Sequence, residues 1–122
     1  MKLINDFFQI VISNIKEDEI VASVKMNADH SIYHAHFPGN PITPGVCLVQ
    51  MSTEILEMGI KRHLHLQHAV KIKFCNPMVP SVEPTFIFQK INISEHSVSV
   101  QVIIRDSNVQ YAKMTLIYTV TL

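Results

Sequence analysis

One helical segment followed by a run of alternating segments constrains the fold of this chain more than any other feature. Residues 45–61 carry apolar residues at helical spacing, on more than one face of the helix. After this helix the apolar residues alternate with polar ones, which predicts strands over residues 67–75, 85–93, 97–105 and 109–121. A helix buried on most sides and a series of antiparallel hairpins predict an α+β domain, with a curved antiparallel sheet wrapped around the helix.

The segments before the long helix have less regular patterns. Residues 19–28 alternate and predict a half-buried strand, with Ile20, Ala22, Val24 and Met26 on one face. Residues 3–12 fit either a strand or a short helix that leads into one, and residues 30–37 predict an irregular segment or a short strand. The end of the long helix is expected near Gly59 and the basic pair Lys61 and Arg62.

Composition narrows the class of protein. The chain has 122 residues, which predicts one domain over 1–122, and its apolar content of 48% is typical of a globular protein. Ten basic and ten acidic residues cancel, which argues against nucleic acid or an anionic membrane as a partner. Only 16% of the residues are charged, so part of the apolar surface is expected to lie in an oligomer interface.

Several features predict a cytoplasmic protein. No apolar run is long enough to span a bilayer, and the first residues lack the pattern of a secretory signal. Cys47 and Cys75 both lie in apolar surroundings and are expected to be reduced, buried thiols. No metal site is expected, because the two histidine pairs at 34/36 and 63/65 have no cysteine or carboxylate at ligand spacing.

The segment HAHFPGNPITPG, residues 34–45, is unusually stiff. Its three prolines fix their own φ and also restrict the residue before each of them. Such a loop can hold His36 at a fixed place relative to the start of the helix. Gly45 opens that helix without a side chain, so a substrate carbonyl oxygen can approach its free N–H. Alternatively, the prolines only separate two elements and His36 is a core histidine.

Two motifs resemble those of a known family. His36-Phe37-Pro38-Gly39-Asn40-Pro41 followed by Pro44-Gly45-Val46 is similar to the loop of the 3-hydroxyacyl-[acyl-carrier-protein] dehydratases, which have the hot-dog fold. Residues 74–80, FCNPMVP, resemble the second motif of that family, Phe-x-x-Pro-Val-x-Pro. The order of elements agrees over essentially the whole chain. The N-terminal His-Arg-x-Pro-Phe string of the family is missing, and Asn5-Asp6-Phe7-Phe8 stands there.

The resemblance implies an activity and its residues. A (3R)-hydroxyacyl thioester on the phosphopantetheine of acyl carrier protein would lose water and become the trans-2-enoyl thioester, in fatty-acid or related biosynthesis. His36 would take the α proton, from a loop with a strained and possibly cis His36–Phe37 peptide bond. The N–H of Gly45 would polarise the carbonyl, and a carboxylic acid on the helix of the other subunit would protonate the leaving hydroxyl. The substrate would lie against Phe37, Pro38, Gly39, Pro44 and Val46.

The same resemblance implies no cofactor bound by the protein itself. The implied partners are acyl carrier protein and a second subunit, in a homodimer, a trimer of dimers or a heterodimer with a paralogue.

The chain departs from the family at the acid. The family carries its carboxylate fourteen residues after the histidine, where this sequence has Gln50. A carboxamide is not a general acid, and losing one typically lowers the rate by about 10²–10⁴. Glu54 stands one turn later, where many members carry glutamine, so the two groups look exchanged and Glu54 can hydrogen-bond Gln50 or reach the site.

Three hypotheses follow for the function. The chain is a dehydratase with Glu54 as a replacement acid; or a hot-dog thioester hydrolase with Glu54 as base or nucleophile; or a non-catalytic subunit that binds acyl carrier protein or pairs with an active paralogue. A glutamate at a surface or interface, with a structural Gln50, is the simpler alternative for this pair.

Overall fold

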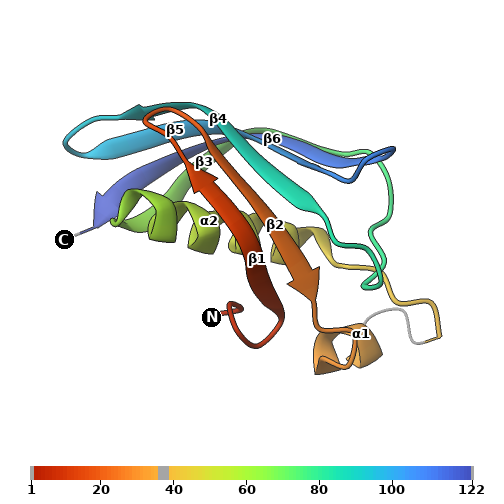
Figure 1. Cartoon of the computed structure of the whole chain (residues 1–122). Coiled ribbons are helices and arrows are strands. Elements are labelled where there is room, and N and C mark those ends of the chain that lie inside the picture. The colour runs from red at the N-terminus through yellow and green to blue at the C-terminus, as the bar shows by residue number, and fades with distance from the viewer. Residues whose placement is uncertain (1, 36–38, 122) are drawn as a thin grey trace.

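The computed structural model describes residues 2–35 and 39–121. Its elements are β1 (Phe8–Ile15), β2 (Ile20–Met26), α1 (Ser31–Ala35), α2 (Gly45–Ile60), β3 (His63–Phe74), β4 (Thr85–Ile93), β5 (Ser97–Arg105) and β6 (Gln110–Thr121). The strands form one antiparallel sheet in the order β1-β2-β4-β5-β6-β3, and the sheet curves over α2 (Figure 1). This is the hot-dog arrangement, so the predicted fold class is confirmed.

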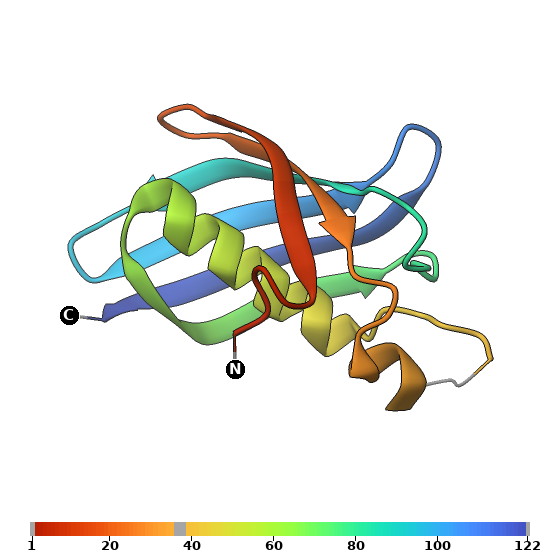
Figure 2. The same cartoon turned by 60° about the horizontal axis from the view of Figure 1, so that its bottom comes forward.

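The alternating patterns placed the strands well. β4 and β5 have the predicted bounds, and β6 begins one residue later than expected. The face of β2 that the sequence predicted to point inward is buried, and so is the inward face of β5: Ile20, Ala22, Val24, Met26, Val98, Val100, Val102 and Ile104. They meet the buried face of α2, which crosses the concave side of the sheet (Figure 2).

Two segment predictions were wrong. Residues 31–35 form the short helix α1 instead of an irregular segment or a short strand, because Tyr33 is buried against Phe7 and shares a hydrogen bond of 2.8 Å with the Thr43 hydroxyl. β3 begins at His63, four residues before the predicted start. The chain turns at Lys61, whose φ is 58°, and enters the sheet almost at once.

The end of α2 also differs from the expected pattern. Gly59 lies inside the helix, and Lys61 takes the left-handed conformation that is more common for glycine. A Cβ at Gly59 would lie 2.4 Å from Cδ1 of Ile20. Gly59 therefore lets the last turn of α2 approach β2 closely, which is a packing role and not a capping role.

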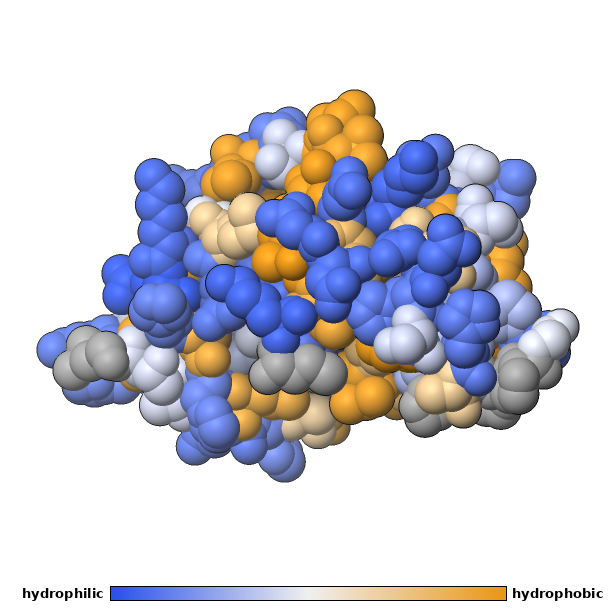
Figure 3. Space-filling view, turned by 90° about the horizontal axis from the view of Figure 1, so that it is seen from below, coloured by the Kyte–Doolittle hydropathy of each residue, from blue (hydrophilic) through white to orange (hydrophobic). Residues whose placement is uncertain are grey.

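Each end of α2 exposes one apolar side chain. Val46 and Met58 are 69% and 53% exposed, whereas the other residues of the helix are buried or half-buried, as predicted. Seen from the side of α2, apolar patches interrupt a polar surface (Figure 3).

In the described part of the chain, no helix has the length and apolar character needed to cross a bilayer. Both cysteines are free, but only Cys47 is buried as expected, whereas Cys75 is half-buried.

The β5–β6 turn provides a test of the fold by pH. Asp106 accepts the hydroxyl of Tyr111 and the backbone N–H groups of Asn108 and Val109, each of these two at 2.9 Å. These bonds, the one from Tyr111 first, lower the pKa of Asp106 below its ordinary 3.8. A lowered folded-state pKa adds stability that is present above the unfolded pKa and is lost as pH falls through the folded pKa.

We therefore expect Asp106→Asn to lower the melting temperature at pH 7, and the difference from the wild type to shrink below about pH 4. Thermal unfolding followed by circular dichroism measures this. Asp29→Asn, a change in the exposed turn before α1, serves as the control. An Asp106→Asn effect that is equally large at pH 3 and pH 7 would contradict the assignment.

Candidate functional site

The N-terminus of α2 presents free backbone donors. Pro44 is the N-cap residue, and its carbonyl accepts from the N–H groups of Cys47 and Leu48 at 3.0 and 3.3 Å. The N–H groups of Gly45 and Val46 have no acceptor in the described part of the chain. Helix N-termini carry partial positive charge, so these two donors suit a carbonyl oxygen that gains negative charge.

The two sequence motifs meet at this helix end. The N–H of Thr43 donates to the carbonyl of Met78 at 2.8 Å, which ties the first motif to the second. The ring of Phe74 lies over Gly45, because a Cβ on Gly45 would come within 2.6 Å of its Cζ atom. Glycine at this position is therefore required by the close approach of the ring. Phe74 itself remains 53% exposed.

The predicted catalytic histidine is not part of this description. His36, Phe37 and Pro38 lie outside the described residues, and so does the expected His36–Phe37 peptide bond. Gly39, the next residue, has a φ of 83°, which a side chain would disfavour. The described part of the loop before α2 thus begins with a glycine in a conformation that other residues rarely adopt.

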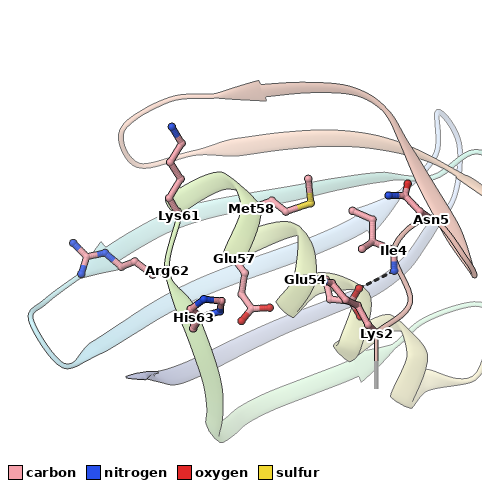
Figure 4. Close-up of a pocket in the computed structure, with 9 residues that line it drawn as sticks. All are labelled: Lys2, Ile4, Asn5, Glu54, Glu57, Met58, Lys61, Arg62 and His63. Atoms are coloured by element: carbon pink, nitrogen blue, oxygen red, sulfur yellow. Dashed lines mark hydrogen bonds between the residues drawn. The ribbon is translucent and has the colours of Figure 1, made fainter. Parts of the chain in front are cut away.

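Glu54 binds the N-terminal segment of its own chain. Its carboxylate accepts from the N–H of Leu3 at 2.9 and 2.8 Å, from the N–H of Ile4 at 2.7 Å and from Nε2 of Gln50 at 2.8 Å. Figure 4 shows the bond to Ile4. The side chain is only 4% exposed. The hydrogen bond between Gln50 and Glu54 that the helical spacing allowed is therefore present.

Gln50 and Glu54 line different hollows. Glu54 borders one of about 480 Å³ between the N-terminal segment and the end of α2, together with Lys2, Ile4 and Met58 (Figure 4). Gln50 borders a second, of about 390 Å³, which runs beside β3 and is also lined by Thr53 and Leu64. The hollow beside β3 is therefore lined by the amide of Gln50 and not by the carboxylate of Glu54.

Sequence reasoning missed Glu57. This residue lies two helical turns after Gln50, on the same face, and borders both hollows. Its Oε2 accepts the N–H of Leu64 at 2.9 Å, so it fastens the start of β3 to α2. The spacing of seven residues from Gln50 was the available signal.

Tyr118 is buried close to the same face of α2. Burial above all, and also the charge of Glu57, raises the pKa of Tyr118 to about 12, although a hydrogen bond with Thr53 opposes this. The phenol is therefore neutral at physiological pH.

In the described part of the chain, no group of three or more His, Cys, Asp or Glu is placed to hold a metal ion.

In the described part of the chain, a six-stranded antiparallel sheet curves around one long helix, which is the arrangement of a hot-dog-fold protein. Similar solved structures share the fold at low identity. The dehydratase heterocomplex ApeI:P from Xenorhabdus doucetiae aligns with a TM-score of 0.68 at 15% identity, over 90% of this chain and 96% of that one. The smu.793 protein of Streptococcus mutans, bound to acetyl-CoA, aligns with a TM-score of 0.70 at 12% identity, over 96% and 90%.

A third similar structure is a hypothetical thioesterase with coenzyme A from Streptococcus pneumoniae TIGR4. It aligns with a TM-score of 0.68 at 12% identity, over 93% of this chain and 85% of that one. Residues 12–114 match the model of the ApeI-like family, described as ApeI dehydratase. The chain belongs to this dehydratase family. No curated protein matches the sequence significantly.

We expect Glu54→Gln to destabilise the protein, because an amide cannot accept hydrogen bonds at both of its terminal atoms. The loss should be about 1.5–3 kcal/mol, the range for bonds to a charged group. Urea unfolding measures it. Glu57→Gln is the matched control, since one amide oxygen still accepts the N–H of Leu64. Equal stability of Glu54→Gln and wild type would show that the N-terminal contact contributes nothing.

We also expect Gly45→Ala to be destabilising by about 1–3 kcal/mol, because the new methyl group overlaps the ring of Phe74. The same change in a Phe74→Ala background should have little effect, because the obstructing ring is gone. A double-mutant cycle of urea unfolding measures this coupling. Additive effects of the two substitutions would mean that the ring does not lie on Gly45 in solution.

Proposed function

We propose that this chain takes part in dehydrating 3-hydroxyacyl thioesters that are carried on the phosphopantetheine of acyl carrier protein. Membership of a dehydratase family supports the reaction class. The observation that carries the proposal is the pair of free N–H groups on Gly45 and Val46, next to the loop with the family's histidine. Donors at that place stabilise the enolate-like oxygen that forms when a proton leaves the α carbon of a thioester.

The residues divide the reaction between two chains. His36 takes the α proton, and the N–H of Gly45 holds the carbonyl oxygen. The bond between Cβ and the hydroxyl then breaks, and the leaving oxygen needs a proton from a general acid. Gln50 has none to give in that role, and the Glu54 carboxylate is engaged by Leu3, Ile4 and Gln50. Glu57, the carboxylate that borders the same hollow as Gln50, accepts the N–H of Leu64. The acid therefore comes from the partner chain.

This requirement favours a partner that is not identical. A second copy would bring only another Gln50 to the site, whereas a paralogue with a carboxylate at that position completes it. One heterodimer then contains one complete site, formed by His36 and Gly45 of this chain and the acid of the other. A similar solved structure is itself a dehydratase heterocomplex, which supports this form of assembly.

Thioester hydrolysis is the second candidate. It is supported by similar structures that are described as thioesterases. The same N–H groups would serve as oxyanion donors, and Glu54 would act on water. The placement of Glu54 weakens this candidate, because its carboxylate borders the hollow beside the N-terminal segment and not the one beside β3.

The test restores the missing acid. We expect Gln50→Glu to raise the rate of enoyl-thioester hydration by the isolated chain by about 10²–10⁴, the usual contribution of a general acid. The assay follows the loss of enoyl-thioester absorbance with a crotonyl thioester of acyl carrier protein. The double variant Gln50→Glu with His36→Ala should return to the background rate, and Glu57→Gln should leave the rate of the Gln50→Glu protein unchanged.

Other outcomes separate the alternatives. Wild type that already hydrates the substrate, and loses this activity on Glu54→Gln, would show that Glu54 is the acid. Release of free thiol from an acyl thioester, abolished by Glu54→Gln, would establish the hydrolase. If Gln50→Glu gives neither reaction at a protein concentration where ultracentrifugation shows a dimer of two copies, the proposal that His36 and Gly45 form a dehydratase half-site is wrong.

A further inference from the structure

The charge of this neutral chain is unevenly distributed. All ten acidic residues lie outside the strands, in turns, loops or α2. The only charged residues in the six strands are basic, namely five lysines and one arginine: Lys25, Lys71, Lys73, Lys90, Arg105 and Lys113. Three histidines, His63, His65 and His68, lie in β3 beside two of these lysines. The sheet is thus positive although the whole chain has a net charge of zero.

Five of these residues lie on one face of β3. His63, His65, His68, Lys71 and Lys73 are opposite Thr121, Thr119, Ile117, Thr115 and Lys113 of β6. The residues between them, such as Leu64 and Ile72, are instead opposite residues of β6 that point toward the core. Opposite residues share a face of the sheet, so the five basic side chains form one outward row, and all are exposed.

β3 is an edge strand of twelve residues. Edge lysines often prevent a strand from pairing with another chain. Here, however, β3 itself exposes two apolar side chains, Val70 at 52% and Phe74 at 53%. Val46, next to the Gly45 that the Phe74 ring covers, is 69% exposed. The hollow beside β3 also contains Gln50, the residue at the family's acid position. These features are typical of an edge that is covered by a partner.

The row of basic residues limits which partner fits. In an antiparallel pairing of β3 with β3 of a second copy, the outward faces align, and each charged outward neighbour is basic in any register. Like charges opposite each other on a sheet are destabilising, and opposite charges are stabilising. Lys73 already faces one like charge, Lys113, within its own chain. A strand with Asp or Glu at its outward positions would complement the row.

We propose that β3 pairs with the edge strand of a different chain, one with acidic residues at its outward positions, and that its basic row disfavours a second copy. The inference rests on the proposed function in one respect, since that function requires a second chain at this edge. It adds that the partner strand is acidic, so that charge determines which chain pairs with β3.

The experiment supplies an acidic edge from this same protein. Lys71→Glu with Lys73→Glu is mixed with wild type, and pairing is measured by analytical ultracentrifugation and native mass spectrometry. Lys25→Glu with Lys90→Glu is the matched control, because it changes the net charge equally on other strands. We expect wild type to bind the acidic-edge variant at least about fivefold more tightly than it binds itself or the control variant.

Salt and a neutral variant provide two further checks on the role of charge. The preference should decrease between ~50 mM and ~500 mM NaCl, because salt screens exposed charges. Lys71→Gln with Lys73→Gln should increase self-association relative to wild type, by about twofold or more. Circular dichroism verifies that each variant folds.

Three results would overturn the proposal. They are a wild-type homodimer as tight as the mixed pair, a mixed pair no tighter than the control pair, and the absence of any mixed pairing at ~100 µM. The measurements use no substrate, so they do not depend on catalysis. Loss of hydration activity in the Gln50→Glu test leaves this inference standing, and failure of charge-selective pairing leaves the half-site chemistry standing.

Discussion

The packing of α2 against the concave face of the sheet is the constraint on which the rest of the structure depends. Only one long helix is present in the described part of the chain, and all the inward residues of β2 and β5 are buried against it or beside it. Gly59 allows the contact with Ile20, and Gly45 allows the contact with Phe74, at opposite ends of the helix. The free N–H groups of the site are thereby fixed in place, because the helix that carries them cannot shift without opening the core.

Glu54 joins this helix to the start of the chain. A carboxylate that is 4% exposed and accepts two backbone N–H groups and an amide is stabilised by the N-terminal segment, and it holds that segment down in turn. This explains the exchange of glutamine and glutamate along the helix in structural terms. The negative group sits where backbone donors surround it, and the neutral amide sits beside β3. A site with an amide at this position needs a proton donor from elsewhere.

Charge separates the sheet from the remainder of the molecule. Opposite charges on turns and strands cancel in the total, so net charge conceals a basic sheet whose densest row lies on the edge strand. In the proposed function, chemistry and assembly depend on the same edge, because the hollow that contains Gln50 lies beside β3. Under that proposal, the partner provides both the acid and the opposite charge.

The sequence by itself determined the architecture. Strict alternation located β4 and β5, and the helical spacing located α2, because each period matches only one backbone geometry. The proline-rich loop and the second motif predicted the family, and the family match confirmed it. Tertiary structure decided the remainder. The helix α1 formed because Tyr33 packs on Phe7. The carboxylate of Glu54 accepts a hydrogen bond from the N–H of Leu3, fifty-one residues away in sequence. Local patterns do not encode such distant contacts, since these depend on which surfaces the folded chain brings together.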